Sequence, residues 1–570
     1  MKLKERWNQK AWPRILLAFG LNAAFLFVML RFFAPMWETN DDLFMSKFVD
    51  GQMAHKTMYV PFVNICLGWV LKNVYTMLGD GFNWYAASQY LLLYLGFTAV
   101  TWVLLRRYRL GPALVMTAVL LGAFGTDCYL SMNFSKPAAL GTVGGMALML
   151  QAMRNASGHT QKTPLALGFL LALCGYVWRF EEFGVCALLM ACGVLAALFE
   201  IRDKHRDLSL GGRMKQFLRL IAPFALLAVC AAGLFVFDLV VWRRPEAGGF
   251  REFNDTRSLF LDFQMPEYCE MPEVYDSVGM DENFVYMMKK WSFYDTERFN
   301  QKNLEILIKA RDSLIPRRTP GECLGVFLNQ CLMGFTLDRP FAGFALLLVI
   351  WLACGKRRAG TWVSLACMAC LFGGIYLFMI WADRYLANRV DIGLFLAMAV
   401  VLSFELDEAR LEAEKLLLTA VLLLSLFITW RMNRAYCFLD RHNTIEDKSA
   451  EKAAIARILE DDEHLFLTKI WAVDHQLYTP LETPPAGYFD RIMLIGGWSM
   501  GHPEIEAILK QWDIENPYRD LVNRDDILLI DNDIDRTLAF LRAAYYPDAE
   551  AELMEPLSGA TGLMIYHIKG

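Results

Sequence analysis

Three carboxylates lie close together near the start of the chain, at Glu38, Asp41 and Asp42, with Thr39 and Asn40 between them. A carboxylate that is held in place can remove a proton from a hydroxyl group, and neighbouring carboxylate oxygens can bind a divalent cation. Hydrophobic residues flank the cluster on both sides, which predicts that it lies at a lipid surface, where unpaired charge is costly. We interpret this acidic cluster as half of a functional site; the alternative is an ordinary solvated loop.

Charged residues of both signs recur at the ends of later apolar segments. The arginine guanidinium is planar and offers two parallel hydrogen bonds, so Arg is well suited to binding a lipid-linked phosphate. A single Arg at a helix end is more often an anchor that reaches the membrane interface. Because both signs gather at corresponding helix ends, we predict that these residues belong to one site: Asp127, Lys136, Arg179, Glu181, Glu182, Arg384 and Arg389.

A long polar insertion between Arg243 and about Pro320 adds further candidates. Asn254, Arg257 and Asp262 lie in its first part, and an aromatic stretch follows at 291–294. Its composition is that of a folded segment and not of a disordered linker. Aromatic rings beside paired polar groups suit sugar binding, but they would equally form a small hydrophobic core, so both interpretations stay open.

The elements that must position these residues are apolar helices. Of the 570 residues, 56% are hydrophobic, and the mean hydropathy is +0.30. Apolar runs of roughly 18 to 25 residues recur, enough to cross a hydrocarbon core. Most of the 13 cysteines lie inside these runs without metal-ligand spacing, which argues against a zinc site or a disulfide framework. The net charge of −5 gives no support to nucleic-acid binding.

Loop charges set the predicted topology. Basic residues precede the first apolar run, which indicates an uncleaved signal anchor with a cytoplasmic N-terminus. If Val60–Leu78 crossed the membrane, the basic turn at 106–109 would fall outside, so we place this segment half-buried at the outer surface. The short polar segment 322–337 is treated in the same way. About eleven spans remain: 12–33, 84–105, 112–131, 135–153, 164–181, 183–200, 217–242, 339–355, 361–381, 388–406 and 414–431.

The last 140 or so residues change character. Short apolar strands are predicted at 465–468, 492–495, 527–530 and 564–566, separated by helices at 447–460, 503–511 and 535–545. Gly496-Gly497 after a strand resembles a nucleotide-binding turn, but no GxGxxG or GK[ST] follows, which favours an ordinary loop. The sequence therefore predicts a polytopic α-helical membrane protein with a small C-terminal extracytoplasmic α/β domain. The predicted boundaries are 1–435, with external loops 34–83 and 243–338, and 436–570.

This layout resembles the GT-C superfamily of integral membrane glycosyltransferases, in particular the oligosaccharyltransferase, protein mannosyltransferase and aminoarabinose transferase group. The resemblance rests on one span followed by the pair Asp41-Asp42, on the half-buried segment that begins Met58-Tyr59-Val60-Pro61, and on the basic turn within Leu104–Gly111. It covers about residues 1–435, by layout more than by identity. The chain departs from the family pattern in its second external loop, which holds Asp127 but no Asp-x-Asp or Asp-Glu.

The resemblance implies transfer of a sugar from a polyprenyl-phosphate carrier to a glycan or other cell-envelope acceptor at the outer face of the membrane. Asp41 or Asp42 would then be the general base. Four cations would neutralise the departing lipid phosphate: Lys136, Arg179, Arg384 and Arg389. The remaining candidates would contact the substrates: Glu38, His55, Asn254, Arg257, Asp262, Glu181 and Glu182.

A metal-dependent enzyme of this kind would use Mg²⁺ or Mn²⁺, with Asp41, Asp42 and Asp127 as oxygen ligands. The expected location is a bacterial plasma membrane, with membrane lipids as neighbours. Three alternatives remain open: a transporter or flippase of lipid-linked saccharides, a polysaccharide polymerase or ligase, and a non-catalytic scaffold. The most informative observation for the enzyme hypothesis is whether Asp41, Asp42, Arg384 and Arg389 line one outward-facing cavity.

Overall fold

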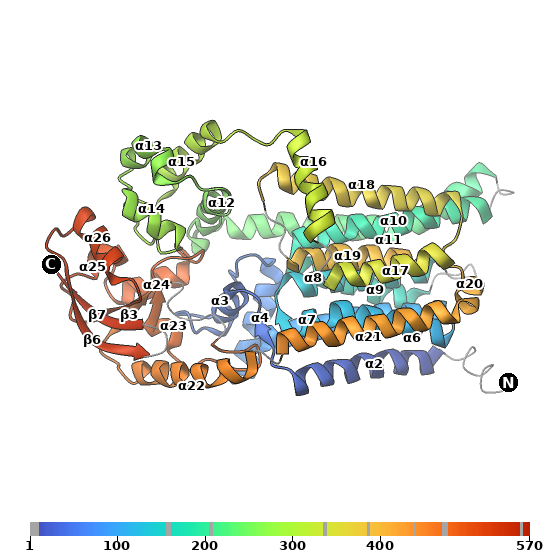
Figure 1. The fold of residues 1–570 in the computed structure, drawn as a ribbon, viewed down its shortest axis with the longest axis horizontal. Helices are drawn as coiled ribbons and strands as arrows, with labels where there is room; N and C mark the ends of the chain where they lie inside the picture. Colours follow the sequence, from blue (N-terminus) through green and yellow to red (C-terminus); the bar gives the residue numbers. More distant parts are fainter. Residues whose placement is uncertain are drawn as a thin grey trace.

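Long helices and one small sheet unit make up the chain (Figure 1). The computed structural model describes residues 11–154, 161–204, 209–334, 339–384, 388–437, 440–469, 477–558 and 563–570. The basic residues that precede the first span fall outside these ranges. Helix α2 (Ala11–Phe32) lies within the bundle half of the molecule, and the C-terminus lies at the opposite end (Figure 1).

A bundle of long helices, side by side in Figure 1, forms the larger part. A helix occupies each of the eleven predicted spans. The members of the bundle are α2 (Ala11–Phe32), α5 (Trp84–Arg107), α6 (Leu110–Leu120) continued by a π-helical turn (Leu121–Gly125) and α7 (Thr126–Leu130), α8 (Ser135–Met153), α9 (Lys162–Trp178), α10 (Phe180–Lys204), α11 (Leu210–Trp242), α17 (Arg339–Cys354), α18 (Ala359–Trp381), α19 (Asn388–Phe404) and α21 (Lys415–Cys437). A short helix, α20 (Glu408–Ala413), precedes α21.

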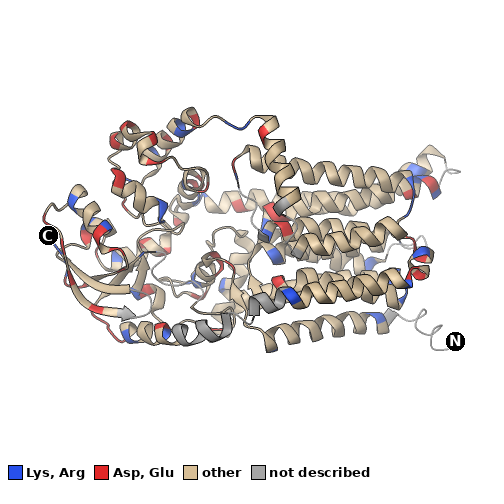
Figure 2. Ribbon diagram, viewed as in Figure 1, with Lys and Arg blue, Asp and Glu red and all other residues tan. Residues whose placement is uncertain are grey.

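Six segments among the described residues are long and apolar enough to cross a membrane: Trp12–Phe32, Trp84–Arg107, Leu110–Leu130, Phe180–Lys204, Leu210–Trp242 and Ala359–Trp381. Their number and apolar character support a helical membrane protein. Shorter apolar helices occur at Ile65–Leu78, Lys162–Trp178 and Pro340–Cys354. Charged residues concentrate at the helix ends and in the non-bundle parts of the chain (Figure 2), as expected when the middle of each helix contacts lipid or other helices.

Helix α8 is buried along almost its whole length in the centre of the bundle. Small residues make this possible, because they let neighbouring backbones approach closely. A Cβ added at Gly144 would lie 2.7 Å from the carbonyl oxygen of Gly96 in α5, and one added at Gly175 in α9 would lie 2.6 Å from that of Ala138. The first turn of α8, which carries Lys136, is thereby fixed between α5 and α9.

A small parallel sheet joins the segment that follows α2 to the segment that precedes α8. Strand β1 (Met36–Trp37) pairs with β2 (Ser131–Met132), and the Glu38 N–H donates to the Met132 carbonyl at 2.8 Å. The acidic cluster lies at the start of a helix, α3 (Asn40–Asp50), where a loop was predicted. Two carboxylates in its first turn suit the positive end of the helix dipole.

The half-buried segment predicted at 60–78 is a helix over Ile65–Leu78 (α4). One face is buried, while Trp69, Met77 and Leu78 are exposed. Its start is fixed by the Asn64 cap and by the Ile65 N–H, which donates to Asp238 of α11 at 2.8 Å. A helix with one apolar face open to its surroundings fits a position at a membrane interface.

The polar insertion folds into short helices. They are a 3-10 turn (Pro245–Ala247), α12 (Phe250–Leu261), a second 3-10 turn (Tyr268–Glu270), α13 (Pro272–Ser277), α14 (Glu282–Lys289) and α15 (Gln301–Leu314). The segment predicted at 322–337 is α16 (Pro320–Asn329) with a π-helical turn (Gln330–Gly334), and its Phe327 ring lies 6.0 Å from Tyr376 of α18. Residues 335–338 lie outside the described ranges.

The C-terminal unit contains a five-stranded sheet in the order β4-β3-β5-β7-β6. Its elements are α22 (Asp440–Leu459), β3 (Leu465–Thr468), α23 (Tyr488–Arg491), β4 (Ile492–Leu494), α24 (Pro503–Gln511), α25 (Pro517–Asp520), β5 (Ile527–Asp531), α26 (Ile534–Ala544), β6 (Glu550–Ser558) and β7 (Leu563–Lys569). Strands β4, β3 and β5 are parallel, and β7 and β6 extend the sheet in antiparallel pairs. All four predicted strands are confirmed, but β6 was missed, because it is a polar edge strand that contains Pro556.

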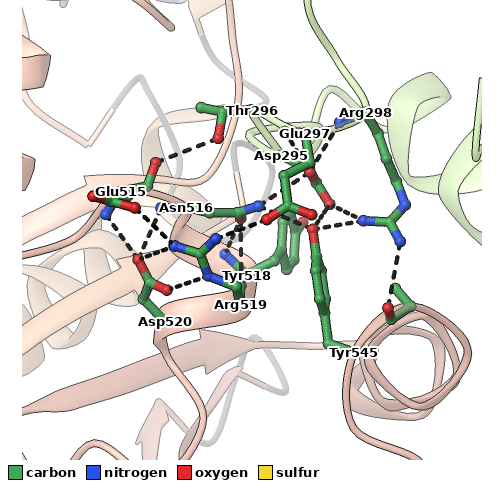
Figure 3. A network of polar contacts seen from close by, with 11 residues as sticks. Asp295, Thr296, Glu297, Arg298, Glu515, Asn516, Tyr518, Arg519, Asp520 and Tyr545 are labelled. Atoms are coloured by element: carbon green, nitrogen blue, oxygen red, sulfur yellow. Dashed lines mark hydrogen bonds and ion pairs between the residues drawn. The ribbon is translucent and has the colours of Figure 1, made fainter.

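The insertion and the sheet unit are joined by a polar network (Figure 3). The fully buried Asp295 carboxylate accepts from Asn516 at 3.1 Å, from Tyr545 at 2.7 Å and from Arg298 at 2.9 Å. The Tyr294 N–H also donates to the carbonyl of Ile495 at 3.2 Å. The insertion, which was grouped with the membrane part in the predicted domains, is thus hydrogen-bonded to the C-terminal sheet unit. The predicted boundary at 435 falls near the end of α21.

Candidate functional site

A cavity of about 370 Å³ lies where the helix bundle, the insertion and the sheet unit meet. Residues that line it come from the first turn of α3, the junction between α9 and α10, helix α12, the first turn of α19 and the loop after β4. Its wall combines cations, carboxylates and aromatic rings: Thr39, Asn40, Asp41, Phe62, Phe134, Arg179, Arg257, Asp262, Trp291, Arg389 and Trp498.

Asp41 is the carboxylate of the acidic cluster that lines this cavity. Its Oδ1 accepts a hydrogen bond from Trp498 Nε1 at 3.0 Å, and its Oδ2 accepts one from Thr39 Oγ1 at 3.1 Å. Because each oxygen has two lone pairs, both retain capacity for a further donor. Asp41 can therefore accept a proton or a hydrogen bond from a molecule in the cavity.

Arg257 is the most buried cation of the wall, at 2% exposure. Its Nε donates to Asn254 Oδ1 at 3.0 Å, and the guanidinium carbon lies 5.3 Å from the centre of the Trp291 ring. Nη1 is buried without a hydrogen-bond partner among the described residues, and it forms an ion pair with Asp262 Oδ1 at 3.6 Å. Burial lowers the pKa of Arg257, while Asp262 and Asp41 oppose this change. An unfilled donor on a buried guanidinium favours an anionic ligand.

Two further arginines converge on the same space. Arg179, at the end of α9, lies with its guanidinium carbon 4.9 Å from the centre of the Phe134 ring and donates to Ser135 Oγ. Arg389 extends from the first turn of α19, and its Nε is buried without a hydrogen-bond partner among the described residues. With Asp41 and Asp262, the five charged residues of the wall carry a formal charge of +1, from three arginines and two aspartates.

The aromatic side of the wall has unusual backbone geometry. Phe62 and Trp291 have φ values of +67° and +58°, which non-glycine residues seldom adopt. Such strained positions persist only where the surrounding structure holds them, and they cluster at functional sites. The Trp498 ring packs against Phe62 with centroids 5.0 Å apart and is itself only 6% exposed. These rings give the cavity apolar surface directly beside its charged groups.

Asp42 points away from the cavity. It is fully buried and accepts hydrogen bonds from Tyr85 at 2.9 Å, from Gln89 at 2.6 Å and from the Phe134 N–H at 3.3 Å. These contacts tie α3 to α5 and to the start of α8. Burial raises the pKa of Asp42 to about 7, although the hydrogen bonds act in the opposite direction. Of the two aspartates proposed as the base, Asp41 alone faces the cavity.

Replacing Asp42 with Asn should remove one source of pH dependence from the folding stability. Unfolded Asp ionises near pH 3.8, whereas folded Asp42 ionises near pH 7. Its carboxyl group therefore binds a proton more tightly in the folded state, and this stabilisation is full below pH 3.8 and is lost as pH rises to about 7. Since one pKa unit corresponds to about 1.4 kcal/mol, the loss amounts to several kcal/mol.

The measurement is the thermal unfolding temperature of both proteins in detergent between pH 4 and pH 8. The wild-type temperature should fall relative to that of Asp42→Asn up to about pH 7 and then stay parallel to it. A constant difference over the whole range would show that Asp42 titrates normally.

Lys136, Glu38 and Asp127 form a separate buried cluster. Lys136 Nζ lies 2.7 Å from Glu38 Oε2 and 2.8 Å from Asp127 Oδ2, and the Lys136 side chain is 1% exposed. None of the three lines the cavity. Lys136, which was predicted to bind the lipid phosphate, therefore has its charge paired inside the protein. The cluster joins α8 to the residue that follows β1 and to α7.

None of the other predicted site residues lines the cavity. The Asn254 side chain accepts a hydrogen bond from Arg257 Nε and so orients the guanidinium. The guanidinium carbon of Arg384 lies 4.5 Å from the centre of the Phe263 ring. Glu181 lies 3.7 Å from Arg179, and the buried Glu182 contacts Cys186 inside the bundle. His55 is exposed and hydrogen-bonds to Glu504. Of the four residues that the enzyme hypothesis places in one cavity, Asp41 and Arg389 line it, whereas Asp42 and Arg384 do not.

The proposed metal ligands are not brought together. Asp127 is paired with Lys136, and Asp42 accepts three hydrogen bonds inside the protein. In the described part of the chain, no three His, Cys, Asp or Glu side chains are grouped so that they could hold a metal ion. The residues present do not fit the predicted Mg²⁺ or Mn²⁺ site, and we assign no step to a metal ion.

Sequence reasoning missed the aromatic residues Phe62, Phe134 and Trp498, and it named Trp291 only as part of an aromatic stretch. The one signal that pointed to Trp498 was the Gly496-Gly497 pair that precedes it. A Cβ at Gly496 would lie 2.0 Å from the carbonyl oxygen of Trp291, so this position requires glycine. The pair thus permits the loop after β4 to approach the insertion.

No protein-family model matches this chain, and neither a curated protein nor a solved structure matches it. The fold and the cavity define the class by themselves: a mostly helical membrane protein with a small mixed sheet unit. Where the two parts join, it carries a cavity of three arginines, two aspartates and four aromatic rings.

Proposed function

We propose that this protein is a membrane glycosyltransferase that moves a sugar from a polyprenyl-phosphate carrier to an acceptor hydroxyl at the outer face of the membrane. The observation that carries the proposal is the meeting of Arg179, Arg257 and Arg389 with Asp41 in one cavity beside the apolar helices. A lipid-linked sugar phosphate presents an anion, a polar ring and an apolar chain. The cavity and the adjacent bundle offer a counterpart to each of them.

The reaction is a single displacement at the anomeric carbon of the sugar. The acceptor oxygen forms a bond to this carbon, and the bond from the carbon to the phosphate oxygen breaks. The proton of the acceptor hydroxyl passes to the Asp41 carboxylate, and the bonding electron pair leaves with the polyprenyl phosphate. Asp41 acts as general base, which is worth about 10²- to 10⁴-fold in rate.

The arginines stabilise the charge that develops on the leaving phosphate. Donors placed in advance around such a charge lower the barrier most when they are partly shielded from water. Arg257 meets this condition, since it is 2% exposed and its Nη1 has no hydrogen-bond partner among the described residues. Arg389 offers a second unfilled donor, its Nε, from the bundle side. Arg179 completes the set from the end of α9.

The acceptor is proposed to enter on the side of the aromatic residues. Trp291, Trp498 and Phe62 provide flat apolar faces, and Asp41 and Asn40 provide polar groups beside them. Pockets that bind polar organic molecules commonly combine apolar walls with a few placed polar groups. A glycan hydroxyl in this space would lie close to Asp41.

The test uses membranes that contain the full chain, with a set of polyprenyl-phosphate sugars labelled in the sugar. Transfer predicts that label leaves the lipid fraction and enters an acceptor, with one polyprenyl phosphate released for each sugar transferred. A transporter or flippase would move the lipid across the membrane with the bond between sugar and phosphate intact. Lipid that is moved but not cleaved, or no cleavage of any donor beyond control membranes, would overturn the proposal.

A further inference from the structure

The loop that carries Trp498 begins at the carboxyl end of strand β4. In open α/β sheets this edge is where ligands bind, because the loops that follow parallel strands gather there. Here the loop after β4 packs against the insertion, with the Gly497 N–H donating to the Trp291 carbonyl at 3.0 Å. Gly497 and Gly501 have φ values of +84° and +77°, so glycine is required at both ends of the loop. The ligand-binding edge of the sheet unit is therefore turned towards the cavity.

The Trp498 indole is held in one orientation. Its ring packs edge-on against Phe62 at 5.0 Å and against Phe44 at 6.2 Å, and it lies 6.2 Å from Phe48. These contacts fix the direction of the N–H, which donates to Asp41 Oδ1 at 3.0 Å. An indole nitrogen can only donate, and a carboxylate oxygen is a suitable acceptor for it.

Asp41 is therefore held from two sides by different parts of the chain. Thr39 Oγ1, two residues earlier at the N-cap of α3, donates to Oδ2, and Trp498 donates to Oδ1 across a separation of 457 residues. Two donors on opposite oxygens fix the rotation of the carboxylate plane. They leave the remaining lone pairs for a hydroxyl in the cavity.

We propose that Trp498 is a positioning residue, through which the C-terminal sheet unit orients the Asp41 carboxylate and so forms part of the reaction centre. This inference rests on the proposed glycosyl transfer for its catalytic meaning. The hydrogen bond from Trp498 to Asp41 can be tested independently of that reaction.

The first experiment compares Trp498→Phe with wild type in the transfer assay. Phe keeps an aromatic ring and removes the N–H. We expect kcat to fall about tenfold, as for loss of one hydrogen bond to a charged group, with less than a twofold change in KM for the lipid donor.

Two matched variants separate positioning from packing. Trp512→Phe changes a tryptophan of the same unit that does not line the cavity, and it should leave kcat and KM unchanged. Trp291→Phe changes a lining ring that makes no hydrogen bond to Asp41 in the described part of the chain, and it should alter KM with less than a twofold change in kcat. A Trp498→Phe enzyme with the kcat of wild type would overturn the proposal.

The second experiment needs no activity. The thermal unfolding temperature is measured for Trp498→Phe, for Asp41→Ala, which has no side-chain acceptor, and for the double variant. If the N–H bonds to Asp41, Trp498→Phe should lower the temperature less in the Asp41→Ala background than in wild type. Additive effects, or a Trp498→Phe protein that does not fold, would assign the indole to packing and overturn the proposal. Coupling without any sugar transfer would instead refute the proposed function and leave the Trp498–Asp41 interaction intact.

Discussion

Replacing Asp41 with Asn is expected to reduce the rate of sugar transfer about 10²- to 10⁴-fold, because the amide cannot accept the proton of the acceptor hydroxyl. The substitution keeps the size of the side chain. Asn can also still accept from Trp498 and Thr39 through its amide oxygen, so the loop after β4 should stay in place. The effect should therefore appear in kcat, with little change in the KM for the lipid donor.

Two aspartates serve as controls for this prediction. Asp80 is exposed and pairs with Lys56 at 2.8 Å, so Asp80→Asn should transfer sugar at the wild-type rate. Asp42→Asn should change the pH dependence of unfolding and retain transfer at the temperature at which it is folded. Full activity of Asp41→Asn would rule out Asp41 as the base. Loss of activity in a folded Asp42→Asn enzyme would assign that role to Asp42.

Replacing Arg257 with Ala is expected to lower kcat/KM about 10²-fold, as for removal of one preorganised donor to a developing negative charge. The guanidinium is buried between Asn254, Asp262 and the Trp291 ring, and its Nη1 has no hydrogen-bond partner among the described residues. Arg257→Lys keeps the charge and loses the planar fork, so it should recover only part of the loss. The measurement is the initial rate at several donor concentrations, with thermal unfolding as the check on folding.

Arg317 offers a matched control from the same insertion. Its guanidinium stacks on Trp381 at 4.4 Å and takes no part in the cavity. Arg317→Ala removes one positive charge from the neighbourhood and should leave kcat/KM within about twofold of wild type, as is usual for an exposed charge. Equal losses in Arg317→Ala and Arg257→Ala would mean that overall charge, and not a bound phosphate, sets the rate.

Much of the secondary structure could be predicted, because its signal is local. Apolar runs of helical length identified every helix of the bundle, and short apolar runs between turn residues identified β3, β4, β5 and β7. The failures are also local in origin. Strand β6 alternates charged and apolar residues and contains Pro556, so it resembles a loop. Within the part of the chain that the structure describes, six of the eleven predicted spans are long and apolar enough to cross a membrane by themselves.

The site residues were predicted by type but not by orientation. Asp41 and Asp42 are adjacent in the sequence, yet on helix α3 their side chains point about 100° apart, and so one lines the cavity while the other is buried. Lys136 and Arg179 both lie at helix ends. Lys136 is paired with two carboxylates, whereas Arg179 lines the cavity. Residue type and spacing cannot decide such cases, because the partner of each charge comes from another element.

The sequence by itself determined that this is a helical membrane protein with a C-terminal sheet unit and an acidic cluster at the end of its first long helix. Hydropathy and charge are properties of short segments, and they can be read without the fold. Only the tertiary structure decided that Asp41, Arg257, Arg389 and Trp498 share one cavity. The hydrogen bond from Trp498 to Asp41 joins residues 457 positions apart, and contacts at that separation depend on how the whole chain packs.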